Sequence, residues 1–132
     1  DDPMATPSNF FRGAVIDFSP DVVRTAHGAV LREACRLHGA RVVDAEAVSS
    51  SGGGGGVRLT HLVVGGDDAT GAAAMIMSRD SRERAKFVLA VMRKSSASAP
   101  LPLLVSMRWV ARVLAAQRPW QSVPLGGDVV NL

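Results

Sequence analysis

Short apolar runs bounded by Gly, Ser or polar residues recur along the chain, and they indicate a sheet. We predict strands at 13–18, 40–45, 59–65 and 103–106. These runs are too short for ordinary helices and contain β-branched residues, as expected of strands buried on both faces. The run at 59–65, LTHLVVG, fits this description best.

The first stretch with helical periodicity follows the first predicted strand. Ser19 is suited to cap a helix, Pro20 to occupy its first position and Asp21 to face its positive N-terminus. Gly39 stands where a helix stop is expected. We therefore predict one continuous helix between Ser19 and Gly39. Its predicted apolar stripe consists of Val22, Val23, Ala26, Val30, Leu31, Ala34 and Leu37.

Two further helices are predicted in the second half of the chain. Asp80, with Glu83 three residues later, resembles a capping box and opens a helix that runs to about Lys94. The third helix occupies about 107–117, and the segment 65–77 is compatible with either a loop or a loose helical turn. The core-facing residues predicted for the two helices are Ala85, Val88, Leu89 and Met92, then Trp109, Val110, Val113 and Leu114.

The strands and helices alternate, which is typical of a parallel sheet covered by helices on both faces. The 132 residues suffice for one such domain. We predict a single α/β domain over 10–125, with a flexible linker at 1–9 and a tail at 126–132. Loop insertions are predicted near 49–57, 66–79 and 94–102. The Ser/Gly-rich insertion lacks the lysine and hydroxyl residue of a phosphate-binding loop, so we interpret it as a flexible coil.

Composition narrows the class of protein. A hydrophobic fraction of 47% can supply one core, and the single cysteine, Cys35, excludes an internal disulfide, which fits a reducing compartment. The net charge of +3 and the pI near 10.0 permit anionic partners without requiring them. No apolar run approaches the roughly 18 residues that cross a membrane, and the first residues do not resemble a secretory signal. These features predict a soluble intracellular protein with no membrane partner.

Three local signatures, in order, resemble those of the BRCT family. They are HGA at 38–40 between a helix and a strand, THLV at 60–63 in a strand, and LVS at 104–106 followed by Trp109. The resemblance covers about 10–125. It implies a four-stranded parallel sheet with the first and third helices on one face and the second on the other. Trp109, Thr60 and Gly39 would then be structural core residues.

The resemblance also implies a function. BRCT domains are non-enzymatic interaction modules of nuclear proteins that act in DNA repair, checkpoints, replication, chromosome segregation and kinetochores. Those that bind phosphopeptides use a Ser or Thr after the first strand, the N–H of the following Gly, and a Lys near the start of the second helix. A phosphoserine needs such a cation and short donors. The main expectation is therefore a phosphorylated protein or peptide as partner.

Ser19 and Lys86 occupy the matching positions, with Arg82 and Arg84 close to Lys86 in the sequence, so these four residues are the predicted phosphate site. Pro20 departs from the family pattern because it stands at the Gly position and has no N–H. The adjacent Asp21 would also repel an anion. The alternative is that Ser19 only caps a helix and Lys86 is only a solvated charge.

Two rival functions remain open at this point. One is a phosphate-independent scaffold that binds other protein domains, and the other is DNA-end binding, which requires basic residues beyond the pocket. Whether Ser19 and Lys86 converge distinguishes the first rival from phosphopeptide binding. Trp120 is interpreted as a cover over the sheet edge or a rim contact.

No catalytic or metal site is predicted. Cys35 and His38 are one helical turn apart, but we interpret Cys35 as a buried thiol that packs as a small apolar side chain. The histidines lack metal-ligand spacing, and no nucleophile–base pair can be assembled. We therefore expect no enzyme activity, no cofactor and no metal.

Overall fold

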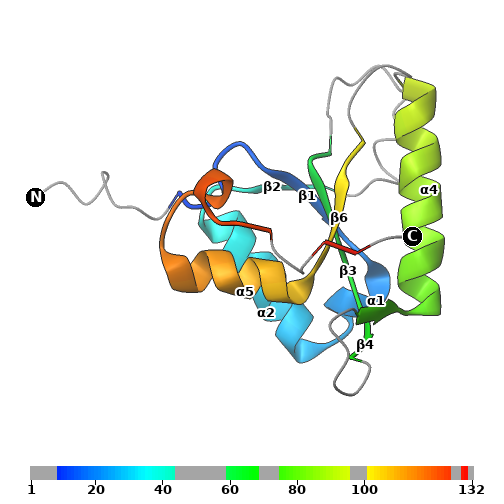
Figure 1. Ribbon diagram of the computed structural model, residues 1–132, viewed down its shortest axis with the longest axis horizontal. Coiled ribbons are helices and arrows are strands. Elements are labelled where there is room, and N and C mark those ends of the chain that lie inside the picture. Colours follow the sequence, from blue (N-terminus) through cyan, green and yellow to red (C-terminus); the bar gives the residue numbers. More distant parts are fainter. Residues whose placement is uncertain (1–8, 44–58, 69–74, 96–100, 126–128, 131–132) are drawn as a thin grey trace, which may run out of the picture.

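The computed structural model describes residues 9–43, 59–68, 75–95, 101–125 and 129–130 (Figure 1). Its centre is a sheet of four parallel strands in the order β2-β1-β3-β6. The strands are β1 (Val15–Phe18), β2 (Arg41–Val42), β3 (His61–Val64) and β6 (Leu103–Ser106). The prediction of an α/β fold built on a four-stranded parallel sheet is confirmed.

Helices cover both faces of this sheet (Figure 1). On one face α2 (Ala26–Leu37) and α5 (Met107–Ala116) pack together, and on the other lies α4 (Arg79–Ser95). Alternate strand residues supply two separate cores. Val63 and Val105 join the cluster under α2 and α5, whereas Leu62 and Leu104 join the cluster under α4.

The core under α2 and α5 is organised around Trp109. Its side chain is fully buried and meets Phe11 edge to face at 5.6 Å between ring centroids. Thr60 ties the start of β3 to β1, because its hydroxyl accepts the N–H of Val15 at 2.9 Å. Gly39 follows α2 with a φ of +99°, a backbone conformation that a residue with a Cβ rarely adopts.

The prediction of one continuous helix between Ser19 and Gly39 is wrong. The chain forms a short helix α1 (Pro20–Val23), breaks, and begins α2 after Thr25, whose hydroxyl accepts the N–H of Gly28 at 2.9 Å. A Cβ on Gly28 would lie 1.9 Å from the carbonyl oxygen of Val22, so the two helices touch backbone to backbone.

The break changes which side of α2 faces the core. Val30 and Leu37, both predicted in the apolar stripe, are each 65% exposed. Leu31, also predicted in the stripe, is buried as expected, and Cys35, which was left out of the stripe, is buried beside it. The buried side of α2 is therefore only partly the predicted stripe.

The start of α4 also differs from the prediction. The proposed capping box of Asp80 and Glu83 is wrong, because Ser78 occupies the capping role: its Oγ accepts the N–H of Ser81 at 3.1 Å. Asp80 lies in the first turn instead. Three of the predicted core residues of α4 are buried, namely Ala85, Val88 and Met92.

The prediction of a loop or a loose helical turn after β3 does not hold for residues 66–68 and 75–77. These residues form an antiparallel pair of strands, β4 (Gly66–Asp68) and β5 (Met75–Met77). The predicted coil at 49–57 and the linker residues 1–8 lie outside the described residues, as does 96–100 of the third insertion. In the predicted tail, Val129 pairs with Val105 at the edge of β6.

Candidate functional site

Two neighbouring pockets open at the carboxyl end of β1, where α1, α2 and α4 meet. The first, the α4 pocket, has a volume of about 370 Å³ and the second, the α2 pocket, about 270 Å³. Pro20 and Arg84 line both, and we call the two pockets together the β1-end groove. The α4 pocket is lined by Pro20, Arg24, Asp80, Glu83, Arg84 and Phe87, and the α2 pocket by Asp17, Phe18, Pro20, Val23, Arg32, Val43 and Arg84. Open α/β sheets bind ligands at this end of their strands.

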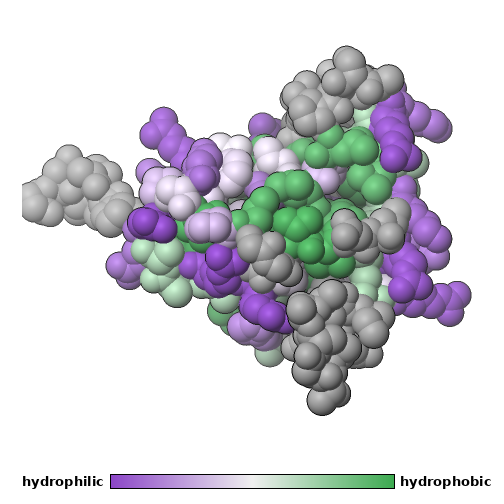
Figure 2. Space-filling model, viewed as in Figure 1, coloured by the Kyte–Doolittle hydropathy of each residue, from purple (hydrophilic) through white to green (hydrophobic). Residues whose placement is uncertain are grey.

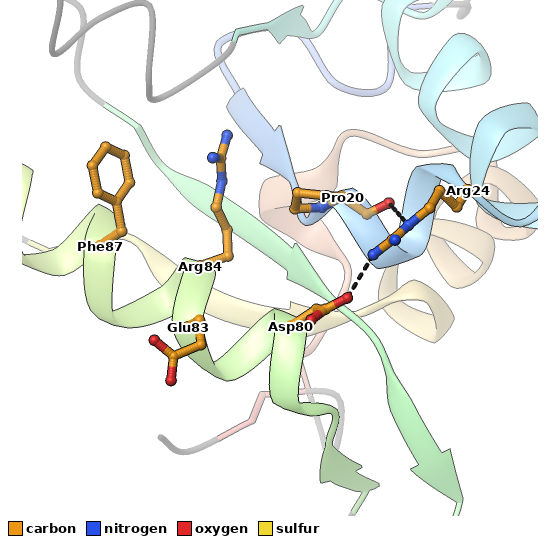
Figure 3. A pocket seen from close by; sticks show the side chains of 6 residues that line it. All are labelled: Pro20, Arg24, Asp80, Glu83, Arg84 and Phe87. Carbon is orange, nitrogen blue, oxygen red and sulfur yellow. Dashed lines mark hydrogen bonds and ion pairs between the residues drawn. The ribbon is translucent and has the colours of Figure 1, made fainter.

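Side chains from two helices face one another across the α4 pocket (Figure 3). Arg84 and Phe87 project from α4, with the guanidinium 5.8 Å from the Phe87 ring centroid. On the other side, Arg24, which follows the last residue of α1, forms an ion pair with Asp80 at 2.5 Å. Both members of this pair are more than half exposed, so it holds the rim in place but contributes little free energy.

A buried ion pair lies where the two pockets meet. Arg84 donates through Nε to Oδ2 of Asp17 at 2.9 Å and through Nη2 to Oδ1 at 3.1 Å. Both side chains are less than 10% exposed. Such a pair is costly to desolvate, but loss of one partner strands a buried charge. Sequence reasoning assigned Arg84 to phosphate, whereas the structure compensates its charge with Asp17.

Asp21 is the centre of a cluster of hydroxyl groups beside this groove. The hydroxyl of Ser19, which is fully buried, donates a short hydrogen bond to Asp21 Oδ1. Ser81 Oγ donates to the same oxygen at 2.8 Å, and Ser78 Oγ donates to Oδ2 at 2.5 Å. The N–H of Gly65 donates to Ser81 Oγ at 2.7 Å, which joins the end of β3 to the cluster.

The hydroxyl groups keep Asp21 ionised. Burial by itself raises the pKa of this carboxyl, but the hydrogen bonds from Ser19, Ser78 and Ser81 outweigh it and leave the pKa below the ordinary value of 3.8. A Cβ on Gly65 would lie 2.9 Å from Asp21 Oδ2, so the carboxylate is also closely confined. The hydroxyl expected to hold a phosphate oxygen therefore holds a carboxylate of the chain itself.

Lys86 and Arg82 lie elsewhere on α4. Both are exposed, and neither lines a pocket of the β1-end groove. In an α-helix, residues two apart point in nearly opposite directions, so Lys86 is turned away from the side on which Arg84 lies. The side chain of Lys86 makes no hydrogen bond or ion pair with the described residues, while Arg82 donates to the carbonyl of Met77 at 3.3 Å. The structure brings Arg84 to the groove and Ser19 to Asp21, and it does not join Ser19 to Lys86.

Several residues of this region were missed from the sequence. Asp17 had a usable signal, because a charged residue in a buried strand requires a partner. Ser78 and Ser81 had a weaker one, since they flank the start of a helix at the spacing of a cap and its recipient. No signal in the sequence indicated that Asp21 lies close to these serines, because they are separated from it by 57 and 60 positions in the chain.

Cys35 is the one thiol among the described residues. Cys35 is fully buried, and burial raises the pKa of its thiol to about 12, so the reactive thiolate is suppressed. The described part of the chain contains no group of three His, Cys, Asp or Glu side chains placed to hold a metal. None of its helices combines the length and apolar character needed to cross a bilayer.

Comparisons of the chain with protein-family models, with curated proteins and with solved structures find no match.

Proposed function

We propose that this chain is a non-enzymatic protein-interaction domain of the BRCT type that binds an unphosphorylated segment of a partner protein in the β1-end groove. The observation that carries the proposal is the carboxylate of Asp21, which accepts the hydroxyl hydrogens of Ser19, Ser78 and Ser81. A nuclear location and a role in DNA repair, checkpoint control or chromosome segregation belong to the same proposal. They rest on the resemblance of the sequence to BRCT domains.

Charge argues against a phosphorylated partner at this position. The side chains lining the groove carry three guanidinium groups and three carboxylates, which balance. Asp21 adds a further negative charge next to Ser19. A phosphate group brings about −1.5 to −2 charge, and repulsion between two unit charges about 4 Å apart costs about 1 kcal/mol in water and about 4 kcal/mol near a protein surface.

The lining of the groove suits an extended segment with an apolar side chain. The α2 pocket has an apolar wall formed by Phe18, Val23 and Val43. The α4 pocket has one formed by Phe87 and Pro20. Glu83 lines the α4 pocket and Arg32 the α2 pocket, and both are exposed, so they can pair with charges of either sign on the partner. The balanced charge also disfavours DNA, which requires a dense basic surface.

The test compares matched phosphorylated and unphosphorylated peptide libraries against the whole chain by fluorescence polarisation. We expect affinities of about micromolar or weaker, where micromolar corresponds to about −8 kcal/mol, with no preference for phosphate. Phe87→Ala should weaken binding because this exposed side chain lines the groove, and Lys86→Ala, one position away, should not. Phosphate-dependent binding that Lys86→Ala abolishes would overturn the proposal and favour the Ser19/Lys86 site.

A further inference from the structure

Val129 and Val130 of the same chain lie along the outer edge of β6. Val129 lies opposite Val105 in an antiparallel bridge, and the N–H of Val130 donates to the carbonyl of Leu104 at 2.7 Å. Figure 1 shows these residues alongside β6, in red next to yellow. The edge therefore accepts an antiparallel strand, and it holds it through backbone groups.

The surface around this edge is unusually apolar. Leu101, Leu103 and Val129 are 39%, 38% and 36% exposed, which places them among the most exposed large apolar side chains of the described residues. Figure 2 shows apolar residues gathered on this side of the molecule, over β6 and the segment that follows the short helix η2 (Trp120–Ser122). Exposed apolar surface beside a strand edge that is covered only by a short segment is typical of a binding site.

A pocket of about 260 Å³ lies beside Leu103 at the start of β6. Its wall is formed mainly by apolar side chains, and it is smaller than the 300–1,000 Å³ typical of drug-sized ligands, so it suits a single large side chain. The pocket is lined by His61, Leu103, Trp120, Gln121, Val123, Pro124 and Leu125. We call it the β6-start pocket.

The register of the bridge decides which partner residue meets this pocket. In an antiparallel strand that keeps Val129 opposite Val105, the residue two positions further on lies opposite Leu103. Side chains two apart share one face of a strand, so that residue faces the β6-start pocket. A bound peptide with the sequence of residues 126–132, GGDVVNL, would present an Asn at that register, which is a poor match for an apolar pocket.

We propose that the β6 edge is a second interaction surface, which binds an extended segment of a partner protein by strand addition and displaces residues Val129–Val130. The favoured segment carries a β-branched residue opposite Val105 and a large apolar or aromatic residue two positions later, in the β6-start pocket. This surface lies apart from the β1-end groove and does not depend on the function proposed for it.

The test measures how three labelled peptides bind the whole chain by fluorescence polarisation. The peptides are GGDVVNL, the same sequence with Asn131→Phe, and the same sequence with Val130→Pro. The chain is used as wild type and as Val130→Pro, which removes the N–H that binds Leu104 and frees the edge. Val130→Thr is the matched control, because it keeps that N–H.

We expect GGDVVNL to bind the Val130→Pro chain at least about tenfold more tightly than wild type or Val130→Thr, because a tethered segment competes at millimolar effective concentration. The Asn131→Phe peptide should bind about tenfold more tightly again, a gain that Leu103→Ser in the chain should remove. The Val130→Pro peptide should not bind, and Phe87→Ala in the chain should have no effect. The Val130→Pro chain should remain monomeric at the concentrations used.

Three results would overturn this proposal. One is failure of GGDVVNL and its Asn131→Phe form to bind the Val130→Pro chain. Another is equal binding of the Val130→Pro peptide, which would mean that backbone pairing is not used. The third is self-association of the Val130→Pro chain in place of peptide binding, which would assign the edge to a second copy of the chain.

Discussion

Two carboxylates at the carboxyl end of β1 are accommodated in different ways, although they lie only four positions apart. Asp17 is buried against the guanidinium of Arg84, so the pair is neutral. Asp21 is held by the hydroxyls of three serines, which stabilise its charge without cancelling it. The groove is therefore neutral at its floor and negative beside Ser19, and this difference decides which partners it can accept.

The largest expected effect is on the neutral pair. Arg84→Met should destabilise the fold by about 3–5 kcal/mol, because it leaves Asp17 buried without a counter-charge. Urea denaturation at neutral pH measures this loss. The double variant Asp17→Asn/Arg84→Met should recover part of it, and a double variant as unstable as the single one would show that packing, and not charge, is responsible.

His61 is another buried ionisable group, and no ion pair joins it to a charged side chain within the part of the chain that the structure describes. It is 1% exposed and stacks on Trp109 at 4.3 Å between ring centroids, and burial lowers its pKa from 6.5 to about 4. The unfolded chain therefore binds this proton at a higher pH than the folded chain, so stability should fall as the pH drops from about 6.5 towards 4.

The lowered pKa of His61 corresponds to a loss of about 3 kcal/mol in the free energy of unfolding once the pH is below both its unfolded and its folded pKa. Urea denaturation of wild type and His61→Phe across this pH range measures it, because the variant removes the group that titrates. We expect the wild type to lose stability relative to the variant as the pH falls. Parallel pH profiles for the two proteins would contradict the assignment.

Asp21 should also lose its stabilising contribution as the pH falls, but in a lower pH range than His61. Asp21→Asn should cost about 1–3 kcal/mol at neutral pH, because it weakens three hydrogen bonds to a charged acceptor. The folded pKa is below 3.8, so this stability is fully present above that value and is lost as the pH falls through the lower folded pKa. The free energies of unfolding of wild type and Asp21→Asn, measured by denaturation, should therefore converge in strong acid. A difference that stays constant with pH would contradict this prediction.

The exposed pair of Arg24 and Asp80 should matter least. Arg24→Ala is expected to change the free energy of unfolding by less than about 1 kcal/mol, because both side chains are largely solvated. Thermal or urea denaturation at two salt concentrations measures it. A loss comparable to that of Arg84→Met would mean that α1 and α4 are coupled more tightly than their exposed contacts indicate.

The sheet and most of the helices could be predicted from the sequence, because the apolar patterns that indicate them are local. The runs in β1, β3 and β6 are apolar over several successive residues, and α4 and α5 repeat their buried positions at helical spacing. The break at Arg24–Thr25 had no such signal. The apolar spacing continues across it, and the close approach of Gly28 to Val22 is visible only in the folded chain.

The candidate site was only partly predictable for the same reason. Ser19 and Arg84, both predicted to bind phosphate, lie near the end of β1, but the side chains that they contact there are mostly distant in the sequence. Asp17 and Arg84 are 67 positions apart. The negative charge of Asp21 was noted, but nothing in a single sequence indicates that three hydroxyls, two of them from the start of α4, converge on it.

The most direct test of the central claim is a titration of the isotopically labelled chain with phosphoserine, followed through the backbone amide signals of Ser19, Ser81 and Lys86. The account predicts no saturable shifts in the wild type up to millimolar concentration, and weak shifts at Ser19 and Ser81 once Asp21→Asn removes the resident negative charge. Saturable shifts at both Ser19 and Lys86 in the wild type would contradict it, because the carboxylate of Asp21 would then not exclude phosphate.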